Sequence, residues 1–293
     1  MSNRLPISVL ITTFNEERNL PDCLASVVWA DEIIVVDSFS TDRTVAIAQA
    51  AGATVKQRAY VNPADQKNWA IPQCTHRWLL ILDADERVLP ELASEIQGLL
   101  ALTGGPPAAA YEIRRRTICF GSELHYCGLQ RDRVTRFFDR TRARYSELEV
   151  HEELIVTGQV ACLSARMTHF TYRTFDDYLE KFGRYTTWSA NDLWKRGKRA
   201  GWWKLLVKPV ARFISMYLLK FGLLDGTAGL IYCGLGSAGV FVRHAKLWAM
   251  QRAVVRNERW SDGRRIIHAG ATVQDRQEII AGGKRGMLDD PKP

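Results

Sequence analysis

The sequence lacks the glycine-rich loops by which two large classes of protein hold nucleotide phosphates. No G-x-G-x-x-G follows its first strand-like run, and G-x-x-x-x-G-K-[ST] occurs nowhere in the 293 residues. The first absence argues against a dinucleotide-binding fold and the second against a P-loop ATPase. A phosphate held by this chain would therefore have to meet other groups.

Cysteines are few and scattered. The six form no C-x-x-C pair and show no spacing typical of zinc ligands; they are Cys23, Cys74, Cys119, Cys127, Cys162 and Cys233. The opening "MSNRLPISVLITTF" also lacks the basic start, long apolar stretch and small-residue cleavage site of a signal peptide. We therefore expect a cytoplasmic protein with reduced, structural thiols.

Positive charge is concentrated in the C-terminal third. The formal net charge is +8, and residues 195–260 hold thirteen Lys and Arg against two acids, Asp225 and Glu258. Such asymmetry indicates either a nucleic acid or an anionic membrane surface as the partner of this part. No nucleic-acid-binding motif accompanies the charge, so we expect no nucleic acid and favour the membrane.

The same third has no long uncharged run. "GWWKLLVKPVARFISMYLLKFGLL" carries repeated Lys and Arg, and "GTAGLIYCGLGSAGVFV" is uncharged but short and contains five glycines. A membrane span needs about 20 nearly uncharged residues. The mixture of aromatic, basic and apolar residues instead predicts two helices lying in the membrane interface. Helices that only pack on the rest of the protein are the alternative.

Over the first hundred residues, apolar strand-like runs alternate with helical segments. The runs are 7–14, 32–38, 54–59 and 78–85, and the helical segments between them are 20–29, 41–53 and 63–74. This alternation predicts an α/β fold with a mostly parallel sheet and helices on both faces. Thr41 or Asp42 is the expected N-cap of the second helix, and Gly52 its stop.

Changes of composition divide the rest of the chain. "GGPP" closes the first part, residues 110–172 are mixed and strand-rich, and Thr174 with Asp177 forms a capping-box start for a helical pattern. The predicted parts are a domain over 1–173 with halves 1–100 and 110–173, a helical and basic region over 174–260, and a polar tail over 261–293.

Polar side chains gather where the predicted strands end. "RWLLILDADERVLP" places Asp83 and Asp85 directly after a strongly apolar strand. Three other strand ends also carry polar groups: Thr12, Thr13, Asn15 and Glu16; Asp37, Ser38 and Ser40; and Arg58. Ligands bind beyond the carboxyl ends of parallel strands. Carboxylates there can hold Mg²⁺ or Mn²⁺ while phosphate oxygens complete the octahedron.

These residues resemble a known family. The stretch "ISVLITTFNEERNLPDCLASVVWADEIIVVDSFSTDRTVAIAQAAGA", with "QKNWA" and "LLILDADERV", is similar to family 2 inverting glycosyltransferases of the GT-A fold. "FFDRTRARYSELEVHEELIVTGQV", "HFTYRTFDDYLEKFGRYTTWSANDLWKRGK" and "FGLLDGTAGLIY" resemble the bacterial subfamily of lipopolysaccharide core β-1,4-glucosyltransferases. The resemblance covers roughly residues 5–250. It implies a UDP-sugar donor and a divalent cation, Mg²⁺ or Mn²⁺.

The resemblance implies roles for the residues of the nucleotide half. Thr12, Asn15 and Glu16 would line the nucleotide crevice. Asp37 would face the uracil, and Lys67 would make a polar contact near the donor.

It also implies roles on the metal and acceptor side. Asp83 would bind the ribose or a metal-linked water, Asp85 the metal, and His169 the metal near the diphosphate. Gly128 falls where the family has a glycine-bearing acceptor loop. Many relatives have Gly-Trp there, and this chain has Gly128–Leu129.

Inverting transfer needs one general base for the acceptor hydroxyl. In "ELEVHEELI" the candidate is Glu152, because the family motif has His-Glu at this point. Glu153 is the rival, and strand alternation would turn the two side chains to opposite faces. His151 is expected to orient its neighbour rather than to bind metal.

The expected function is transfer of a hexose, with glucose favoured, from a UDP-sugar to a lipid-borne saccharide of the lipopolysaccharide inner core. The protein is expected peripherally on the cytoplasmic face of the bacterial inner membrane. Alternatives are a polyprenyl-phosphate or other cell-envelope glycosyltransferase, and a non-catalytic nucleotide-sugar-binding module. A phosphohydrolase is disfavoured, because the first strand ends in "TTFNEE" without a nucleophilic aspartate.

Overall fold

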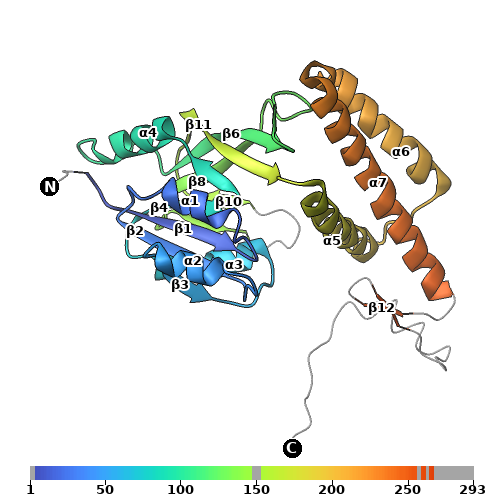
Figure 1. Ribbon diagram of the computed structural model, residues 1–293, viewed down its shortest axis with the longest axis horizontal. Helices are drawn as coiled ribbons and strands as arrows, with labels where there is room; N and C mark the ends of the chain where they lie inside the picture. Colours follow the sequence, from blue (N-terminus) through green and yellow to red (C-terminus); the bar gives the residue numbers. More distant parts are fainter. Residues whose placement is uncertain (1–3, 147–152, 256–258, 262–263, 267–293) are drawn as a thin grey trace, which may run out of the picture. The chain divides into compact units, whose positions relative to one another are not determined.

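The computed structural model describes residues 4–146, 153–255, 259–261 and 264–266. The chain forms two compact units (Figure 1). The sheet unit comprises Met1–Thr174 with Phe221–Gly229, and the helical unit comprises Phe175–Lys220 with Leu230–Pro293. Each is described by itself.

The sheet unit is built on one large mixed sheet. Along the sheet the strands follow the order β3 (Thr54–Gln57), β2 (Glu32–Asp37), β1 (Ile7–Thr13), β4 (Trp78–Asp83), β8 (Arg133–Asp139), β6 (Ala110–Cys119), β11 (Val160–Tyr172) and β5 (Glu86–Val88), and β7 (Ser122–Leu124) pairs with β6. The first four strands are mutually parallel. The parallel arrangement predicted for the first hundred residues is therefore confirmed for these four strands.

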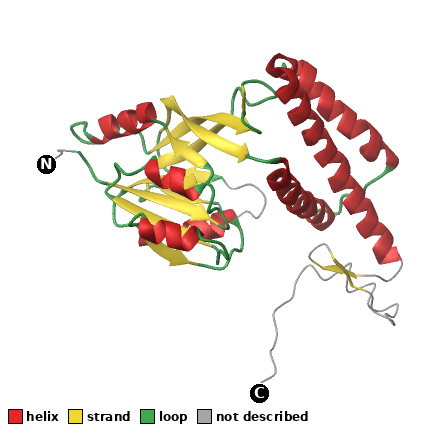
Figure 2. Cartoon of the chain, in the orientation of Figure 1, coloured by secondary structure: helices red, strands yellow, loops and turns green. Residues whose placement is uncertain are grey.

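Helices cover both faces of this parallel half, as the sequence predicts (Figure 2). Its helices are α1 (Leu20–Ala25), α2 (Thr44–Ala50), α3 (Pro63–Ala70) and α4 (Pro90–Leu100). Ile7, Val9 and Ile11 of β1 pack in the core with α1, α2 and α4, whereas Leu10 packs in a second core with α3. Successive side chains of a strand point to opposite faces, which produces the two cores.

The second half of the sheet mixes strand directions. β8 runs antiparallel to both β4 and β6, β11 is parallel to β6, and β5 is antiparallel to β11. The last pairing sets Glu86 opposite His169. β9 (Ala143–Tyr145) and β10 (Leu154–Val156) form a separate two-stranded sheet. The mixed, strand-rich character predicted for residues 110–172 is thus present. Because β11 pairs with β5, which directly follows β4 in sequence, this half brings the chain back to the end of β4.

The segment Phe221–Gly229 belongs to the sheet unit although it lies late in the sequence. Its 3₁₀ turn, η3 (Gly222–Asp225), places the Asp225 carboxylate where it accepts hydrogen bonds from the backbone N–H groups of His125 (3.0 Å) and Tyr126 (2.9 Å). Cys127 and Gly128, which follow, have φ of +61° and +94°. Asp225 therefore fixes the entry of a sharply turned loop that contains Gly128.

The helical unit contains most of the remaining described helices. They are α5 (Phe175–Lys195), α6 (Trp202–Ile214), the π-helical turn η2 (Ser215–Leu219) and, from Leu230 onward, α7 (Gly226–Val255); the short strands β12 (Arg259–Ser261) and β13 (Arg264–Ile266) pair with each other. Lys246 of α7 donates to the Gly183 carbonyl (2.8 Å) and to the hydroxyls of Thr186 (2.8 Å) and Thr187 (2.7 Å). This joins α7 to α5.

By length and composition, the helical stretch Gly222–Arg252 is sufficient to cross a membrane, and little of its most apolar window is buried. The uncharged segment considered too short for a span is thus part of a longer continuous helix. The G-x-G-x-x-G pattern at 234–239 lies inside α7, so it does not form the strand-to-helix turn of a dinucleotide site.

Candidate active site

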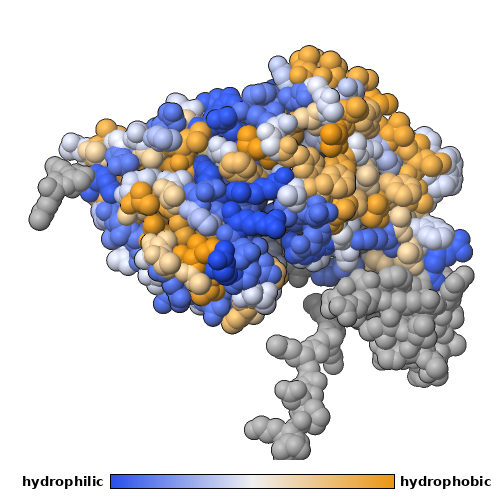
Figure 3. Space-filling model, in the orientation of Figure 1, coloured by the Kyte–Doolittle hydropathy of each residue, from blue (hydrophilic) through white to orange (hydrophobic). Residues whose placement is uncertain are grey.

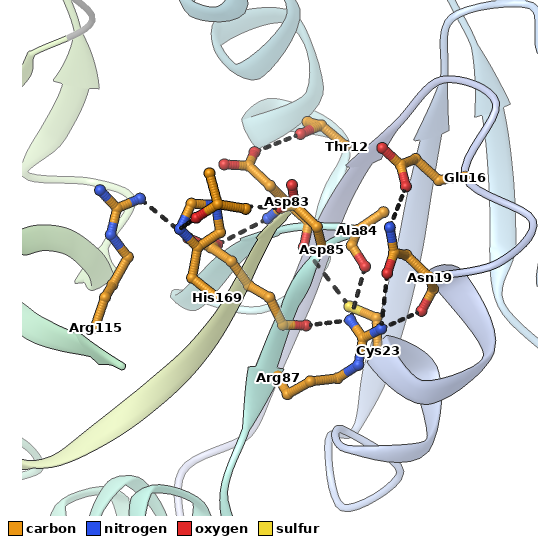
Figure 4. A network of polar contacts seen from close by, with 12 residues as sticks. Thr12, Glu16, Asn19, Cys23, Asp83, Ala84, Asp85, Arg87, Arg115 and His169 are labelled. Atoms are coloured by element: carbon orange, nitrogen blue, oxygen red, sulfur yellow. Dashed lines mark hydrogen bonds and ion pairs between the residues drawn. The ribbon is translucent and has the colours of Figure 1, made fainter. Parts of the chain in front are cut away.

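The apolar strand β4 ends in a carboxylate held by three different groups. Asp83 Oδ1 accepts a hydrogen bond from Thr12 Oγ1 at 3.0 Å (Figure 4) and lies 3.7 Å from Lys67 Nζ. Its other oxygen pairs with Arg136. Burial by itself raises the pKa of Asp83, but the charges of Arg136 and Lys67 hold it well below its usual range. The side chain is still 40% exposed, so an ionised carboxylate faces solvent at this strand end.

Thr12, Lys67 and Asp83 were all predicted to contact the donor, and the fold brings them together. Parallel pairing of β1 with β4 sets Thr12 beside Asp83. Lys67 comes from α3, where only 3% of it is exposed, and its ammonium lies 5.3 Å from the centre of the Tyr145 ring.

A second carboxylate supports the first and was not predicted. Glu86 is fully buried; its Oε2 accepts from the Asp83 backbone N–H at 2.9 Å and its Oε1 from Arg136 at 3.0 Å. Arg115 lies 3.7 Å from the same Oε1. Burial, with the Asp83 charge, raises the pKa of Glu86, and Arg136 opposes that change. The sequence signal for Glu86 is an acid directly after the D-x-D pattern, and the signal for Arg136 is an arginine directly before two phenylalanines.

Asp85 and His169 form a separate pair beside this network. His169 Nε2 lies 3.7 Å from Asp85 Oδ1, and the Phe170 N–H donates to the Asp85 carbonyl at 2.9 Å. Both side chains are partly accessible, at 15% and 18%. The antiparallel pairing of β11 with β5 makes this meeting possible, although the two residues are 84 positions apart in sequence.

The Asp85–His169 pair offers two donors to a divalent cation and no more. One carboxylate and one imidazole are common donors, but a hexacoordinate ion needs further oxygens. Within the described ranges, no group of three or more His, Cys, Asp and Glu is arranged to hold a metal ion. Diphosphate oxygens and water would therefore have to supply the remaining ligands.

Asp37, predicted to face the base, is buried at the end of β2. It accepts hydrogen bonds from the Ser40 backbone N–H (3.0 Å), the Ser40 hydroxyl and Gln57 Nε2 (3.0 Å). Asn15, with φ of +53°, donates through its backbone N–H to Ser40 Oγ at 2.8 Å. The turn after β2 thus links Asp37 to Asn15, and a bound base would have to share the Asp37 oxygens with this turn.

The other predicted positions are occupied by local contacts. Glu16 accepts from Asn19 Nδ2 at 2.6 Å, and the Asn19 carbonyl accepts from Arg87 at 2.7 Å (Figure 4). Asn19 Oδ1 also accepts from Arg173 at 2.6 Å. Arg58 pairs with Asp65 at 2.8 Å, so its charge is already used within the fold.

The predicted base lies outside the part of the chain that the structure describes. Glu152 and His151 both fall in the segment 147–152. Glu153, the rival, is exposed, and its backbone carbonyl accepts from the Ser146 N–H at 2.8 Å. The choice between Glu152 and Glu153 stays a prediction.

Comparison with known proteins identifies the class. Residues 8–119 match the model of Glycosyl transferase family 2. Residues 8–119 thus match a family 2 glycosyltransferase domain, and this match together with the mixed α/β sheet confirms the α/β, GT-A fold class predicted from the sequence.

Among individual relatives, the chain is similar to the lipopolysaccharide core biosynthesis glycosyltransferase LpsC of Rhizobium meliloti (strain 1021). They share 29% identity over 259 residues, covering 84% of this chain and 95% of LpsC. The uncharacterized glycosyltransferase RP128 of Rickettsia prowazekii (strain Madrid E) is 27% identical over 251 residues, covering 82% of this chain and 86% of that one. Both alignments extend well beyond the family domain.

Solved structures match over a smaller part. Glucosyl-3-phosphoglycerate synthase of Mycobacterium tuberculosis with Mn²⁺, UDP-glucose and glycerol 3-phosphate is 20% identical, with a TM-score of 0.34, and the match covers 47% of this chain and 57% of that one. The same enzyme with Mn²⁺, UDP and phosphoglyceric acid is 22% identical, with a TM-score of 0.32, and the match covers 40% of this chain and 44% of that one. The chain thus spans about half the length of these solved proteins.

Proposed function

We propose that the protein transfers a hexose, glucose being the first candidate, from a UDP-sugar to a lipid-linked saccharide of the lipopolysaccharide core, with inversion. The observation that carries this proposal is the pair of carboxylates at the end of β4, each held by a different set of partners. The name of LpsC, with which the chain aligns over most of both lengths, supports the acceptor class.

The two carboxylates have different proposed roles. Asp83, fixed between Thr12 and Arg136, binds the ribose or a metal-linked water. Asp85 and His169 would hold a divalent cation, Mg²⁺ or Mn²⁺, at the strand end. When bound, the cation neutralises the charge that develops on the departing UDP. Asp37, at the end of β2, faces the uracil. Asn15 and Glu16, after β1, line the nucleotide crevice between the uracil and the diphosphate.

The proposed base is Glu152. It takes the proton of the acceptor hydroxyl while that oxygen attacks the sugar from the side opposite the leaving diphosphate. A single displacement of this kind needs one base and gives inversion.

The experiment that tests donor binding compares UDP affinity with Mn²⁺ and with excess chelator. Asp85→Ala should abolish most of the gain that Mn²⁺ gives the wild type, because the diphosphate then loses its charge partner. Asp176→Ala, which removes an exposed carboxylate from the first turn of α5, is the matched control and should retain the gain. Equal metal dependence in all three proteins would contradict the metal bridge.

A screen of UDP- and GDP-sugars for donor hydrolysis then identifies the sugar. Hydrolysis of UDP-glucose alone supports the proposal as stated. Preference for another UDP-hexose would revise the donor only, whereas absence of turnover with every donor and lipid-linked acceptor would favour a non-catalytic binding module.

We further propose that the helical unit docks on the cytoplasmic face of the inner membrane. Large apolar side chains gather over α6 and α7 (Figure 3), and α6 exposes 70% of Trp202, 58% of Trp203 and 61% of Leu206. Aromatic and apolar side chains on a basic helix are typical of interfacial helices. Co-sedimentation of the whole protein with anionic vesicles tests docking, and recovery entirely in the supernatant at low salt would contradict it.

A further inference from the structure

One face of α6 carries a row of cations. Lys204, Lys208 and Arg212 are spaced by four residues, so they follow one another along the same side of the helix. The Lys204 ammonium donates to the Arg199 carbonyl, a neutral group. The row therefore holds three positive charges that lie within about three turns of helix.

Helix α7 adds further cationic side chains to this row. Ser237 Oγ donates to the Pro209 carbonyl at 2.7 Å, which holds α7 against α6. Two turns further along α7 lie Arg243 and His244. His244 is 2% exposed, and its ring is placed by a contact between Nδ1 and the Val240 carbonyl at 2.8 Å.

The charges of the two helices act on one another. Burial, followed by the charge of Arg212, lowers the pKa of Arg243. Burial also lowers the pKa of His244, and the charges of Arg243, Lys208 and Lys204 add to this effect. We call Lys204, Lys208, Arg212 and Arg243 the cationic cluster.

No carboxylate of the described residues forms an ion pair with any member of the cationic cluster, and Arg243 Nε is buried with no hydrogen-bond partner there. Two other arginines of the helical unit differ in their ion pairing: Arg184 pairs with Glu180 at 3.9 Å, although its Nε is also buried without a hydrogen-bond partner, and Arg196 pairs with Asp192 at 3.1 Å. Like charges brought together without a counter-ion destabilise a fold. A buried, unpaired guanidinium N–H adds a further cost.

We infer that the cationic cluster binds a phosphate group, and that this phosphate belongs to an anionic membrane lipid. Arginine and lysine are the side chains that recognise phosphate, by charge and by forked hydrogen bonds. The lipid is chosen over a soluble phosphate because the same helix exposes Trp202, Trp203 and Leu206, which offer apolar contact beside the charge. The inference rests on the proposed membrane docking and adds a defined headgroup site to it.

The test compares two double variants that lose the same charge. Arg212→Gln/Arg243→Gln removes half of the cluster, whereas Arg184→Gln/Arg196→Gln removes two arginines already paired with acids. Partition of each full-length protein is measured on phosphatidylcholine vesicles with and without phosphatidylglycerol. Each cation near an anionic surface contributes on the order of fivefold in affinity, so the cluster variant should bind anionic vesicles about 30-fold more weakly. The control variant should stay within about threefold of the wild type.

Thermal unfolding separates a binding role from a structural one. Removing unpaired like charges should leave the Tm unchanged or raise it. A Tm of the cluster variant well below that of the control would make these arginines part of the packing and would overturn the site.

Two further outcomes also overturn it. Equal weakening of both double variants would reduce the effect to net charge. In the second, inorganic phosphate or glycerol phosphate binds the wild type at millimolar concentration, and the cluster variant binds vesicles as well as the wild type does. This result would assign the site to a soluble ligand. The UDP-binding test of the proposed transferase activity uses a variant of the sheet unit, so failure here would leave that activity standing.

Discussion

The sheet unit and the helical unit treat charge in opposite ways. In the sheet unit, the buried charges at the end of β4 have partners of opposite sign: Arg136, whose side chain is 7% exposed, pairs with the carboxylates of both Asp83 and Glu86. In the helical unit, Arg212 and Arg243 form no ion pair with any carboxylate of the described residues, and burial followed by the charge of Arg212 lowers the pKa of Arg243. Apolar side chains differ similarly, since the strands of the sheet bury theirs while α6 exposes Trp202.

The difference separates a unit that pairs the charges of its site internally from one that leaves several cations without an acidic partner among the described residues. A polar network satisfied within the protein holds its groups in place before any ligand arrives, and such preorganisation is what a reaction centre needs. Unpaired charge and exposed apolar surface instead indicate a partner that supplies the missing contacts. The sheet unit therefore suits chemistry on a small donor, and the helical unit suits attachment. Each prediction below changes one side of this comparison.

The largest effect is expected at the proposed base. Glu152→Gln should lower turnover by about 10²–10⁴-fold, the usual contribution of a general base, and should leave UDP affinity unchanged. Steady-state transfer with a lipid-linked acceptor measures the first quantity and calorimetry the second. Glu153→Gln is the control of identical chemistry, one position away. A crippled Glu153→Gln enzyme with an active Glu152→Gln enzyme would move the base by one residue.

The next largest effect is expected on the free energy of unfolding, at Arg136, which pairs with both Asp83 and Glu86. Arg136→Gln leaves the buried Glu86 carboxylate without its closest cation, and breaking a buried pair in this way costs about 3–5 kcal/mol. Urea unfolding measures it. Arg43→Gln is the control, because Arg43 is 82% exposed and its pairing with Glu17 at 3.5 Å is worth at most about 1 kcal/mol. Equal costs for the two variants would mean that burial does not strengthen the Arg136 network.

The parallel half of the fold follows directly from local sequence. Runs such as "SVLIT" and "IIVV" are apolar without alternation, as strands buried on both faces require, and Pro63 and Pro90 open helices where the missing N–H has no cost. Local boundaries were less well predicted. The second helix begins at Thr44, and Asp42 accepts from the Thr44 and Glu17 N–H groups rather than acting as the cap residue itself.

The site was predictable only where its residues follow the parallel strands. Thr12 and Asp83 end neighbouring strands, so the fold class alone brings them together. Arg136 and Arg115 reach the site because β8 pairs with β4 and β6 pairs with β8, in a register set by contacts between residues far apart in sequence. No periodicity in a single sequence encodes that order. His169 could be suggested only by resemblance, and its distance to Asp85 depends on the short strand β5, which was not predicted.

A smaller effect is expected at Asp225, in the segment Phe221–Gly229 that belongs to the sheet unit. Asp225→Ala removes the acceptor of two backbone N–H groups at the entry of the Gly128 loop, which we propose faces the acceptor. Losing two such bonds should raise the KM for the lipid-linked acceptor on the order of tenfold. Donor hydrolysis without acceptor should not change. Thr227→Ala, an exposed change in the same segment, is the control. Parallel losses in donor hydrolysis and acceptor KM would indicate general unfolding instead.

The smallest effect concerns acid, and it compares the paired carboxylates of the sheet unit with the rest of the molecule. Asp139 is 1% exposed; burial raises the pKa of its carboxyl, but hydrogen bonds from Arg77 and Thr141 lower it below the ordinary value. Because the pKa is lower in the folded state, the carboxylate contributes stability above its unfolded pKa of about 3.9, and that contribution is lost as the pH falls through the folded pKa.

Asp139→Asn should therefore cost about 1–2 kcal/mol at neutral pH, where the paired carboxylate is lost, and less near pH 3, which lies below the unfolded pKa of about 3.9, so that the carboxyl of the unfolded chain is mostly protonated. Urea unfolding of the sheet unit at the two pH values measures the difference. The control is Asp192→Asn in the helical unit, an i,i+4 pair at a helix surface, whose cost should stay within about 0.5 kcal/mol at both pH values. A cost for Asp139→Asn that does not depend on pH would show that the side chain stabilises the pairing of β4 with β8 by its shape and by neutral hydrogen bonds. The contrast in charge between the two units would then not extend to Asp139.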